Sequence, residues 1–214
     1  MEKNYTNIKN SFKVLVDTII EKGVDHSLLC IVGDIFESKS YLNTDDIFQW
    51  KAMCHLLKKE NIKCIIIPGN HDSNCNSELV RDNISLLTTD YKNIVCLNKT
   101  WIYTEIFDDP RLEFHIFSPI DKLIPDFEKG NSNKIQIALL HEPINYASYD
   151  NGESISNARF VSKDLKKYDY VLLGDIHLHQ FLTNRIAYCG SFVQKNKGEG
   201  INKGYILWDL DTGV

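Results

Sequence analysis

The sequence of 214 residues contains no apolar run near the roughly 20 residues that a membrane-spanning helix needs. Its first five residues, MEKNY, also lack the apolar segment of a secretory signal peptide. The six cysteines form no C-x-x-C pair, which argues against a structural zinc site. Several of them lie within apolar strand patterns, as buried, reduced thiols do. These absences predict a protein with no membrane segment in an intracellular setting, cytoplasmic or nuclear.

An excess of positive charge is absent as well. The chain has 24 Lys and Arg residues against 29 Asp and Glu, which gives a net charge of −5. This balance argues against a protein that coats nucleic acid by bulk electrostatics, but it suits an acidic pocket that binds cations. There is no internal repeat. At 43% hydrophobic residues the chain can bury one substantial core, so we expect a single domain over residues 1–214.

Polar side chains follow four apolar segments that have the pattern of buried parallel strands. The clearest is the run 64–67, which ends in Pro68-Gly69 and leads directly into Asn70-His71-Asp72. The other three are 28–32 before Gly33-Asp34, 135–140 before His141, and 170–173 before Gly174-Asp175-Ile176-His177. Loops beyond the carboxyl ends of such strands carry the chemistry of α/β enzymes. We therefore expect these side chains to converge at one edge of a sheet.

The remaining patterns predict a layered α/β sandwich of two mixed β-sheets flanked by helices. Amphipathic helices are expected at about 5–21 and 45–59, the second capped by Thr44, with shorter helices near 78–87 and 162–167. Strands at 93–97, 100–107 and 112–118 are expected to form an antiparallel second sheet. Further strands are expected at 180–182, 185–189 and 205–210.

The polar set has the composition of a dinuclear centre for phosphate-ester hydrolysis. In this interpretation Asp34 bridges two metals, while Asn70, His141, Asp175 and His177 supply the other ligands. Oxygen and imidazole donors without thiolate favour manganese, iron or zinc over copper or calcium. His71 is then free to carry a proton to the leaving group, and Asp72 either orients it or caps the turn.

These blocks resemble those of the calcineurin-like metallophosphoesterases, in the same order along the chain. They are Gly33-Asp34-Ile35-Phe36, Gly69-Asn70-His71-Asp72, His141, and Gly174-Asp175-Ile176-His177. Within that superfamily the chain resembles the SbcD-type nuclease subunit of the double-strand-break repair complex. The residues that carry this finer resemblance are Gln180, Tyr188-Cys189-Gly190-Ser191-Phe192, Lys197-Gly198-Glu199 and Lys203-Gly204-Tyr205. Some virus-encoded members look similar.

The resemblance implies a metal-dependent phosphodiesterase, with Mn²⁺ as the first expectation and Fe²⁺ or Zn²⁺ as alternatives. It implies DNA as the substrate, cut by exo- or endonuclease action, and an SMC-like ATPase as a partner. Asp34 and His71 are the expected catalytic residues. Asp34, Asn70, His141, Asp175 and His177 are the expected metal ligands.

Two departures from the family pattern matter. Asp175 stands where the family has His, which keeps a ligand but changes its charge. The family also begins with a central strand ending in D-x-H that supplies two ligands, and no such motif precedes the Leu28 strand here. We therefore expect an N-terminally incomplete domain, by truncation, a misplaced start or degeneration. One metal, on Asp34, Asn70, His141 and Asp175, should be well held, and the other, on Asp34 and His177, weak or absent.

Other interpretations remain open at this point. The protein is a phosphatase or phosphodiesterase for small molecules, or an inactive fragment or binding module that keeps the fold. The basic residues Arg185, Lys195, Lys197 and Lys203 form either a solvated turn or an edge that contacts phosphate. His179 lies outside the family pattern, so we expect it to be exposed.

Overall fold

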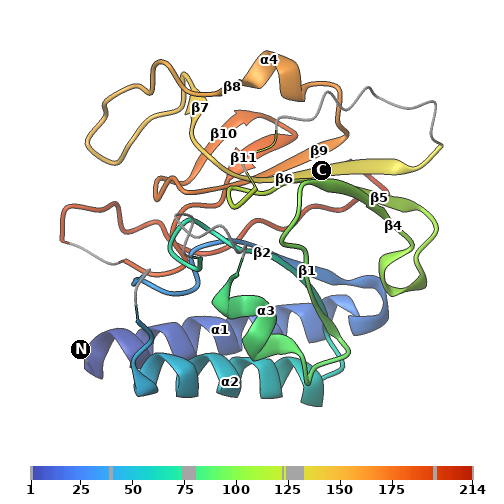
Figure 1. The fold of residues 1–214 in the computed structure, drawn as a ribbon, viewed down its shortest axis with the longest axis vertical. Helices are drawn as coiled ribbons and strands as arrows, with labels where there is room; N and C mark the ends of the chain where they lie inside the picture. The colour runs from blue at the N-terminus through green and yellow to red at the C-terminus, as the bar shows by residue number, and fades with distance from the viewer. Residues whose placement is uncertain are drawn as a thin grey trace.

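The computed structural model of the chain describes residues 2–38, 41–73, 81–121, 123, 133–194 and 197–213. Two β-sheets stack face to face, with helices below the first and a small cap above the second (Figure 1). The first sheet has the order β1-β2-β3, and all its strands are parallel. Its strands are β1 (Leu28–Val32), β2 (Lys63–Ile67) and β3 (Ile94–Cys96).

The second sheet is mixed and has the order β10-β11-β9-β6-β5-β4. The four central strands are parallel to their neighbours, while β4 and β10 run antiparallel at the two ends. Its strands are β4 (Trp101–Thr104), β5 (Leu112–Phe117), β6 (Ile135–His141), β9 (Tyr170–Gly174), β10 (Gln180–Thr183) and β11 (Ile186–Tyr188). The predicted sandwich of two mixed sheets flanked by helices is therefore confirmed, although the first sheet contains parallel strands only.

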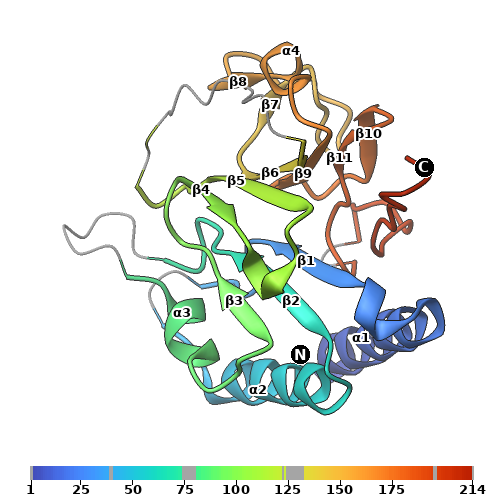
Figure 2. The same cartoon turned by 90° about the vertical axis from the view of Figure 1, so that its right-hand side faces the viewer.

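Helices cover the outer face of the first sheet. Figures 1 and 2 show α1 and α2 side by side along this face, with α3 at one end. The bounds of these helices are α1 (Glu2–Lys22), α2 (Thr44–Lys59) and α3 (Asn83–Thr88). The small cap above the second sheet consists of β7 (Ile144–Asn145), β8 (Phe160–Val161) and α4 (Ser162–Leu165). Short 3-10 turns at Val24–His26 and Ile106–Asp108 complete the elements. No described helix is long and apolar enough to cross a lipid bilayer.

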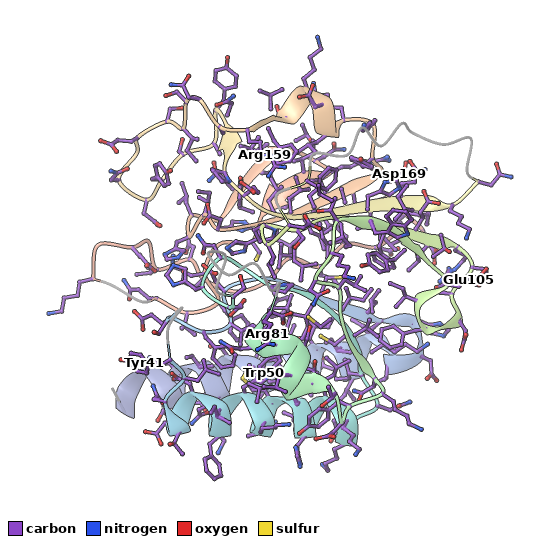
Figure 3. The ribbon with its side chains drawn as sticks, in the orientation of Figure 1. Tyr41, Trp50, Arg81, Glu105, Arg159 and Asp169 are labelled. Atoms are coloured by element: carbon purple, nitrogen blue, oxygen red, sulfur yellow. The ribbon has the colours of Figure 1, made fainter. Side chains whose placement is uncertain are left out.

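Strand alternation divides the core into layers. On β2, Ile65 and Ile67 face the second sheet, while Cys64 and Ile66 face the helices. The buried Trp50 of α2, labelled in Figure 3, belongs to the helical layer, where its ring meets Phe36 edge-on at a centroid distance of 6.5 Å. Both faces of the central strands are thus covered, which explains their continuous apolar sequences.

Several predicted elements differ from the observed ones. Asn43 rather than Thr44 caps α2, because the Asn43 side chain accepts the Asp46 amide hydrogen bond at 2.8 Å. The 93–97 segment pairs in parallel with β2 in the first sheet, not in an antiparallel second sheet. Strand β4 ends at Thr104, because Glu105 takes a left-handed conformation with φ 59°. The helix expected near 78–87 is observed as the shorter α3 (Asn83–Thr88), while residues 78–80 of the expected range lie outside the described part.

The edge of the first sheet at β1 has no neighbouring strand among those described. β1 pairs with β2 alone, and all five of its residues are only half-buried. The segment 205–210 was expected to be a strand, but it forms none, although its residues alternate between exposed and half-buried. A cavity of about 310 Å³ borders this edge, lined by residues 29–36, 174–177 and 189–193 together with Tyr205 and part of α1. The cavity leads from the apolar edge of β1 to the polar residues at its carboxyl end.

Candidate metal centre

Three of the predicted site residues meet where parallel strands of the two sheets end. Asp34 follows β1, His141 ends β6, and Asp175 follows β9. Their ligand atoms all lie within 4.8 Å of one another, and no other such group of three occurs among the described residues. His141 Nε2 is 3.3 Å from Asp34 Oδ2 and 3.8 Å from Asp175 Oδ1. The two sheets thus bring Asp34 together with two residues that lie more than 100 positions later in the sequence.

The orientation of His141 is fixed by the backbone of β1. Its Nδ1 lies 2.7 Å from the Val32 carbonyl oxygen, and because a carbonyl only accepts hydrogen bonds, Nδ1 carries the hydrogen. In the neutral imidazole the lone pair is then on Nε2, which faces the two carboxylates. Nε2 is buried and has no hydrogen-bond partner in the described structure. A buried nitrogen lone pair beside two carboxylates has only acceptors around it, so a cation is the partner that satisfies all three.

The charges of the site act on one another through a partly buried environment. Burial opposes ionisation of Asp34, but His141 and His71 outweigh it and lower the pKa of this carboxyl group. Burial raises the pKa of Asp175, and the neighbouring Asp34 adds to the effect. Burial disfavours the charged form of His141, yet Asp34 and the Val32 carbonyl raise its pKa. The raised pKa of His141 reflects the negative charge that the two neighbouring carboxyl groups place around its imidazole.

Tight backbone geometry builds this cluster. Asp34 and Asp175 both have left-handed φ angles, of 54° and 81°, which non-glycine residues seldom adopt. Gly33, with φ 81°, passes so close to His141 that a Cβ would lie 2.2 Å from Nδ1. A Cβ on Gly174 would lie 2.0 Å from the Val32 carbonyl oxygen. Strained residues of this kind cluster at functional sites, where surrounding contacts hold them in place.

The loop after β2 carries Asn70 and Asp72 and touches the site through the backbone of His71. The side-chain oxygen Oδ1 of Asn70 is buried without a hydrogen-bond partner in the described structure, so it too is an acceptor without a donor. Asp72 has a different role. Its carboxylate accepts backbone hydrogen bonds from Gly69, Ile35 and Phe36, at 2.8, 3.2 and 2.9 Å. Of the two roles left open for Asp72, the structure therefore gives it the turn-capping one, which ties the loops after β1 and β2 together.

His71 lies beside the three clustered residues without belonging to them. Its backbone N–H donates to Asp34 Oδ1 at 3.0 Å. Its Nδ1 is within hydrogen-bond distance of the Glu37 carbonyl oxygen, so Nδ1 carries the hydrogen here as well. The Glu37 carbonyl, not Asp72, therefore orients the ring and leaves Nε2 available for exchange of a proton.

His177 lines the same cavity as the cluster, but its ring atoms are not among the ligand atoms within 4.8 Å of one another. Its Nδ1 lies 3.1 Å from Glu199 Oε1. The sequence did not indicate Glu199 as part of the site, although Glu199 lies in the Lys-Gly-Glu block of the tail. Lys203, considered for a solvated turn or a phosphate-contacting edge, is instead buried against Glu199, at 3.1 Å. Lys195 lies outside the described residues, and His179 is exposed as expected.

Comparison with known proteins agrees with this geometry. A family model described as calcineurin-like phosphoesterase matches residues 4–179. The chain belongs to this family. It is also 30% identical over 217 residues to "Uncharacterized protein R555" of Acanthamoeba polyphaga mimivirus. That match covers 94% of this chain but only 15% of the viral protein, so the chain spans about a seventh of that relative's length.

Membership of the family makes the chain a metallophosphoesterase domain, with divalent metal ions implied and phosphoester bonds as the target of hydrolysis. The residues present fit such an ion. Asp34, His141 and Asp175 offer two carboxylates and one imidazole nitrogen within 4.8 Å of one another, and Asn70 has a buried amide oxygen without a hydrogen-bond partner in the described structure. Oxygen and imidazole ligands of this kind suit the divalent ions used in phosphate chemistry.

Proposed function

We propose that this domain is a metal-dependent phosphodiesterase that cleaves the backbone of DNA. The observation that most directly supports a bound metal ion is the buried Nε2 of His141, which has no hydrogen-bond partner in the described structure and faces the carboxylates of Asp34 and Asp175. Without a metal ion, this nitrogen either lacks a donor, which costs about 1–3 kcal/mol for a buried polar atom, or must carry a proton that faces Asp34. A bound cation removes that cost and accounts for both carboxylates.

The roles of the residues follow from their positions. Asp34, His141 and Asp175 hold a metal ion, and Asn70 adds its amide oxygen. Such an ion, when bound, polarises the phosphoryl group and makes a bound water acidic enough to act as hydroxide near neutral pH. His71 holds a proton at Nε2 once it is charged, with its Nδ1 fixed on the Glu37 carbonyl. From the loop beside Asp34 it delivers that proton to the departing oxygen.

DNA as the substrate is supported by the resemblance to the SbcD-type nucleases, which extends into the tail block around Gly190 and Glu199. The same resemblance supports Mn²⁺ as the metal and an SMC-like ATPase as the partner of the full-length protein. The viral relative is itself uncharacterised and adds no substrate. A net charge of −5 is compatible with this substrate, since bound cations offset the acidic pocket.

The proposal is tested by measuring metal content and cleavage in the same preparations. After loading with Mn²⁺, elemental analysis should find one or two ions per chain, and linear duplex DNA should be degraded. Asp34→Asn should lose metal binding and activity by more than the ~10- to 100-fold typical of residues behind the ligands. Asp45→Asn is the matched control, because Asp45 is exposed on α2, and it should behave like the wild type.

Three results would separate the alternatives. Turnover of a nitrophenyl phosphodiester without DNA cleavage would replace DNA by a small-molecule substrate. Metal binding without turnover of either substrate would indicate a binding module. No metal after Mn²⁺ loading would overturn the catalytic proposal as a whole.

A further inference from the structure

The last described loop of the chain folds back onto the backbone of His177. The Ser191 N–H donates to the His177 carbonyl oxygen at 3.1 Å, and Lys203 Nζ donates to the same oxygen at 2.9 Å. Gly190, with φ 77°, passes so close that a Cβ would lie 2.6 Å from this oxygen. Gly190, Ser191 and Lys203 therefore pack against the backbone of His177.

Within this loop a buried ion pair lies directly behind the imidazole. The side chains of Glu199 and Lys203 are each only 7% exposed, and Glu199 Oε2 lies 3.1 Å from Lys203 Nζ. Glu199 Oε2 also accepts a hydrogen bond from Ser191 Oγ at 3.2 Å. Lys203 Nζ is further 3.9 Å from Asp150 Oδ1, which in turn accepts the Gly200 N–H. Glu199 and Lys203 therefore compensate each other's charge, and Asp150 of another loop adds a second carboxylate beside Lys203.

The other oxygen of this carboxylate holds His177. Glu199 Oε1 lies 3.1 Å from Nδ1 of the ring. A carboxylate only accepts hydrogen bonds, so Nδ1 carries the hydrogen and, in the neutral imidazole, the lone pair is on Nε2. The Val32 carbonyl imposes the same form on His141. Two histidines that line one cavity thus present the same nitrogen with a free lone pair.

We propose that Glu199, braced by Lys203, is a positioning residue that holds the His177 imidazole in the Nδ1–H form so that its Nε2 binds a second divalent metal ion. The inference rests on the proposed function, because it takes His177 as a metal ligand. A carboxylate behind a ligating imidazole is a recurrent arrangement that fixes the ring and strengthens the donor. Stability alone does not require the pair, since apolar residues of similar volume often replace a buried ion pair without loss.

The first test reads the tautomer of His177 in the metal-free protein. Long-range ¹⁵N–¹H spectra of the histidine-labelled chain at pH 8 should show His177 as Nδ1–H, with the signal assigned by its loss in His177→Gln. In Glu199→Gln the amide oxygen should turn toward the Lys203 ammonium and its NH₂ toward Nδ1. The His177 ring should then change to the Nε2–H form. Glu153→Gln, an exposed glutamate on a neighbouring loop, is the matched control and should leave the spectrum unchanged.

The second test measures Mn²⁺ binding by isothermal titration calorimetry. Glu199→Gln should weaken the weaker of the two Mn²⁺ sites by about 10- to 100-fold and leave the tighter site unchanged. The double variant Glu199→Leu/Lys203→Met guards against a folding defect. It removes both buried charges together, so it should melt near the wild-type temperature and still bind the second ion weakly.

Either of two results would overturn the inference. One is an Nε2–H tautomer of His177 in the wild type, and the other is unchanged Mn²⁺ affinity in a folded Glu199 variant. Failure of the proposed function looks different, because then the wild type neither binds Mn²⁺ nor cleaves a phosphodiester. In that case the tautomer measurement still decides whether Glu199 positions His177.

Discussion

At the scale of single residues, the centre depends on positions where only glycine leaves enough room. Gly33 and Gly174 let the backbones of β1 and β9 approach His141 so closely that any side chain would displace the imidazole or the Val32 carbonyl. The hydrogen bond from His141 Nδ1 to the Val32 carbonyl orients the ring, and it forms because Gly33 and Gly174 have no Cβ.

We predict that Gly33→Ala weakens Mn²⁺ binding and lowers the free energy of unfolding by more than Gly152→Ala does. Both glycines have similar φ values, +81° and +85°, so both variants carry a backbone strain of about 1–2 kcal/mol. Only at Gly33 does the new Cβ meet His141, because nothing lies within 4 Å of a Cβ on Gly152. Urea denaturation and Mn²⁺ titration of the two variants measure the difference. Equal losses would show that the contact with His141 is unimportant.

Much of the site could be predicted at this scale, and some of it could not. Asp34, His141 and Asp175 each directly end a strand pattern, so sheet geometry alone predicts that they converge. The ligand roles of Asn70 and His177 remain predictions. Glu199 could not be found in this way, because it lies 22 residues beyond His177 on a loop without periodicity. Contacts that depend on how a loop folds back carry no local signal in the sequence.

At the scale of elements, the start of α2 shows how one side chain sets a boundary. Asn43 occupies the N-cap with extended φ and ψ, and Thr44 is already the first helical residue. Both residue types are good caps, so the sequence did not decide between the two neighbours. The position of the cap is set by which of the two residues has extended φ and ψ angles, and here that residue is Asn43.

The loss of stability on replacing a capping residue should therefore differ strongly between Asn43 and Thr44. Asn43→Ala should lower the free energy of unfolding by about 1 kcal/mol, because the Asp46 N–H loses its acceptor. Thr44→Ala should change it by less than about 0.5 kcal/mol, since alanine is favourable inside a helix. Urea denaturation measures both values. A larger loss for Thr44→Ala than for Asn43→Ala would contradict the assignment of the cap.

A second prediction at this scale concerns His115 on β5. Burial lowers the pKa of this histidine even though Glu113 Oε1 lies 2.8 Å from its Nε2 and favours the charged form. The unfolded chain therefore binds a proton below about pH 6.5 that the folded chain resists. The contribution of His115 to the free energy of unfolding is fully present above about pH 6.5. It decreases as the pH falls, by at most about 1.4 kcal/mol per pH unit.

The measurement is urea denaturation at pH 8 and pH 5.5 for the wild type and His115→Gln. Other groups also titrate in this interval, so the informative quantity is the difference between the two proteins. The wild type should lose more stability on acidification than the variant. Identical losses would mean that His115 does not contribute to the pH dependence.

At the scale of the whole molecule, the two-sheet architecture followed from the order of the patterns, whereas the pairing did not. Parallel pairing of β1 with β2 was predictable from the crossover helix between them. The segment 93–97 pairs with β2 in the first sheet, next to Cys64 and Ile66. This pairing is a tertiary contact, which the local sequence pattern does not encode. The segment 205–210 kept the alternation of a strand without a partner strand in the described structure. Strand patterns thus predict the fold class better than they predict the neighbours.

Strand β1 is half-buried and pairs with β2 alone among the described strands, which has a practical consequence for handling the protein. An edge that has no neighbouring strand in the described structure and carries apolar side chains is a template on which a second copy can add its own edge. We predict reversible self-association that grows with concentration, seen by sedimentation velocity as a dimer and larger species. Leu29→Lys should suppress it, because a charge on the edge disfavours such pairing, and its melting temperature shows whether the fold is kept. A wild type that stays monomeric at every concentration would mean that side chains already shield this border, and that concentrated stocks need no special care.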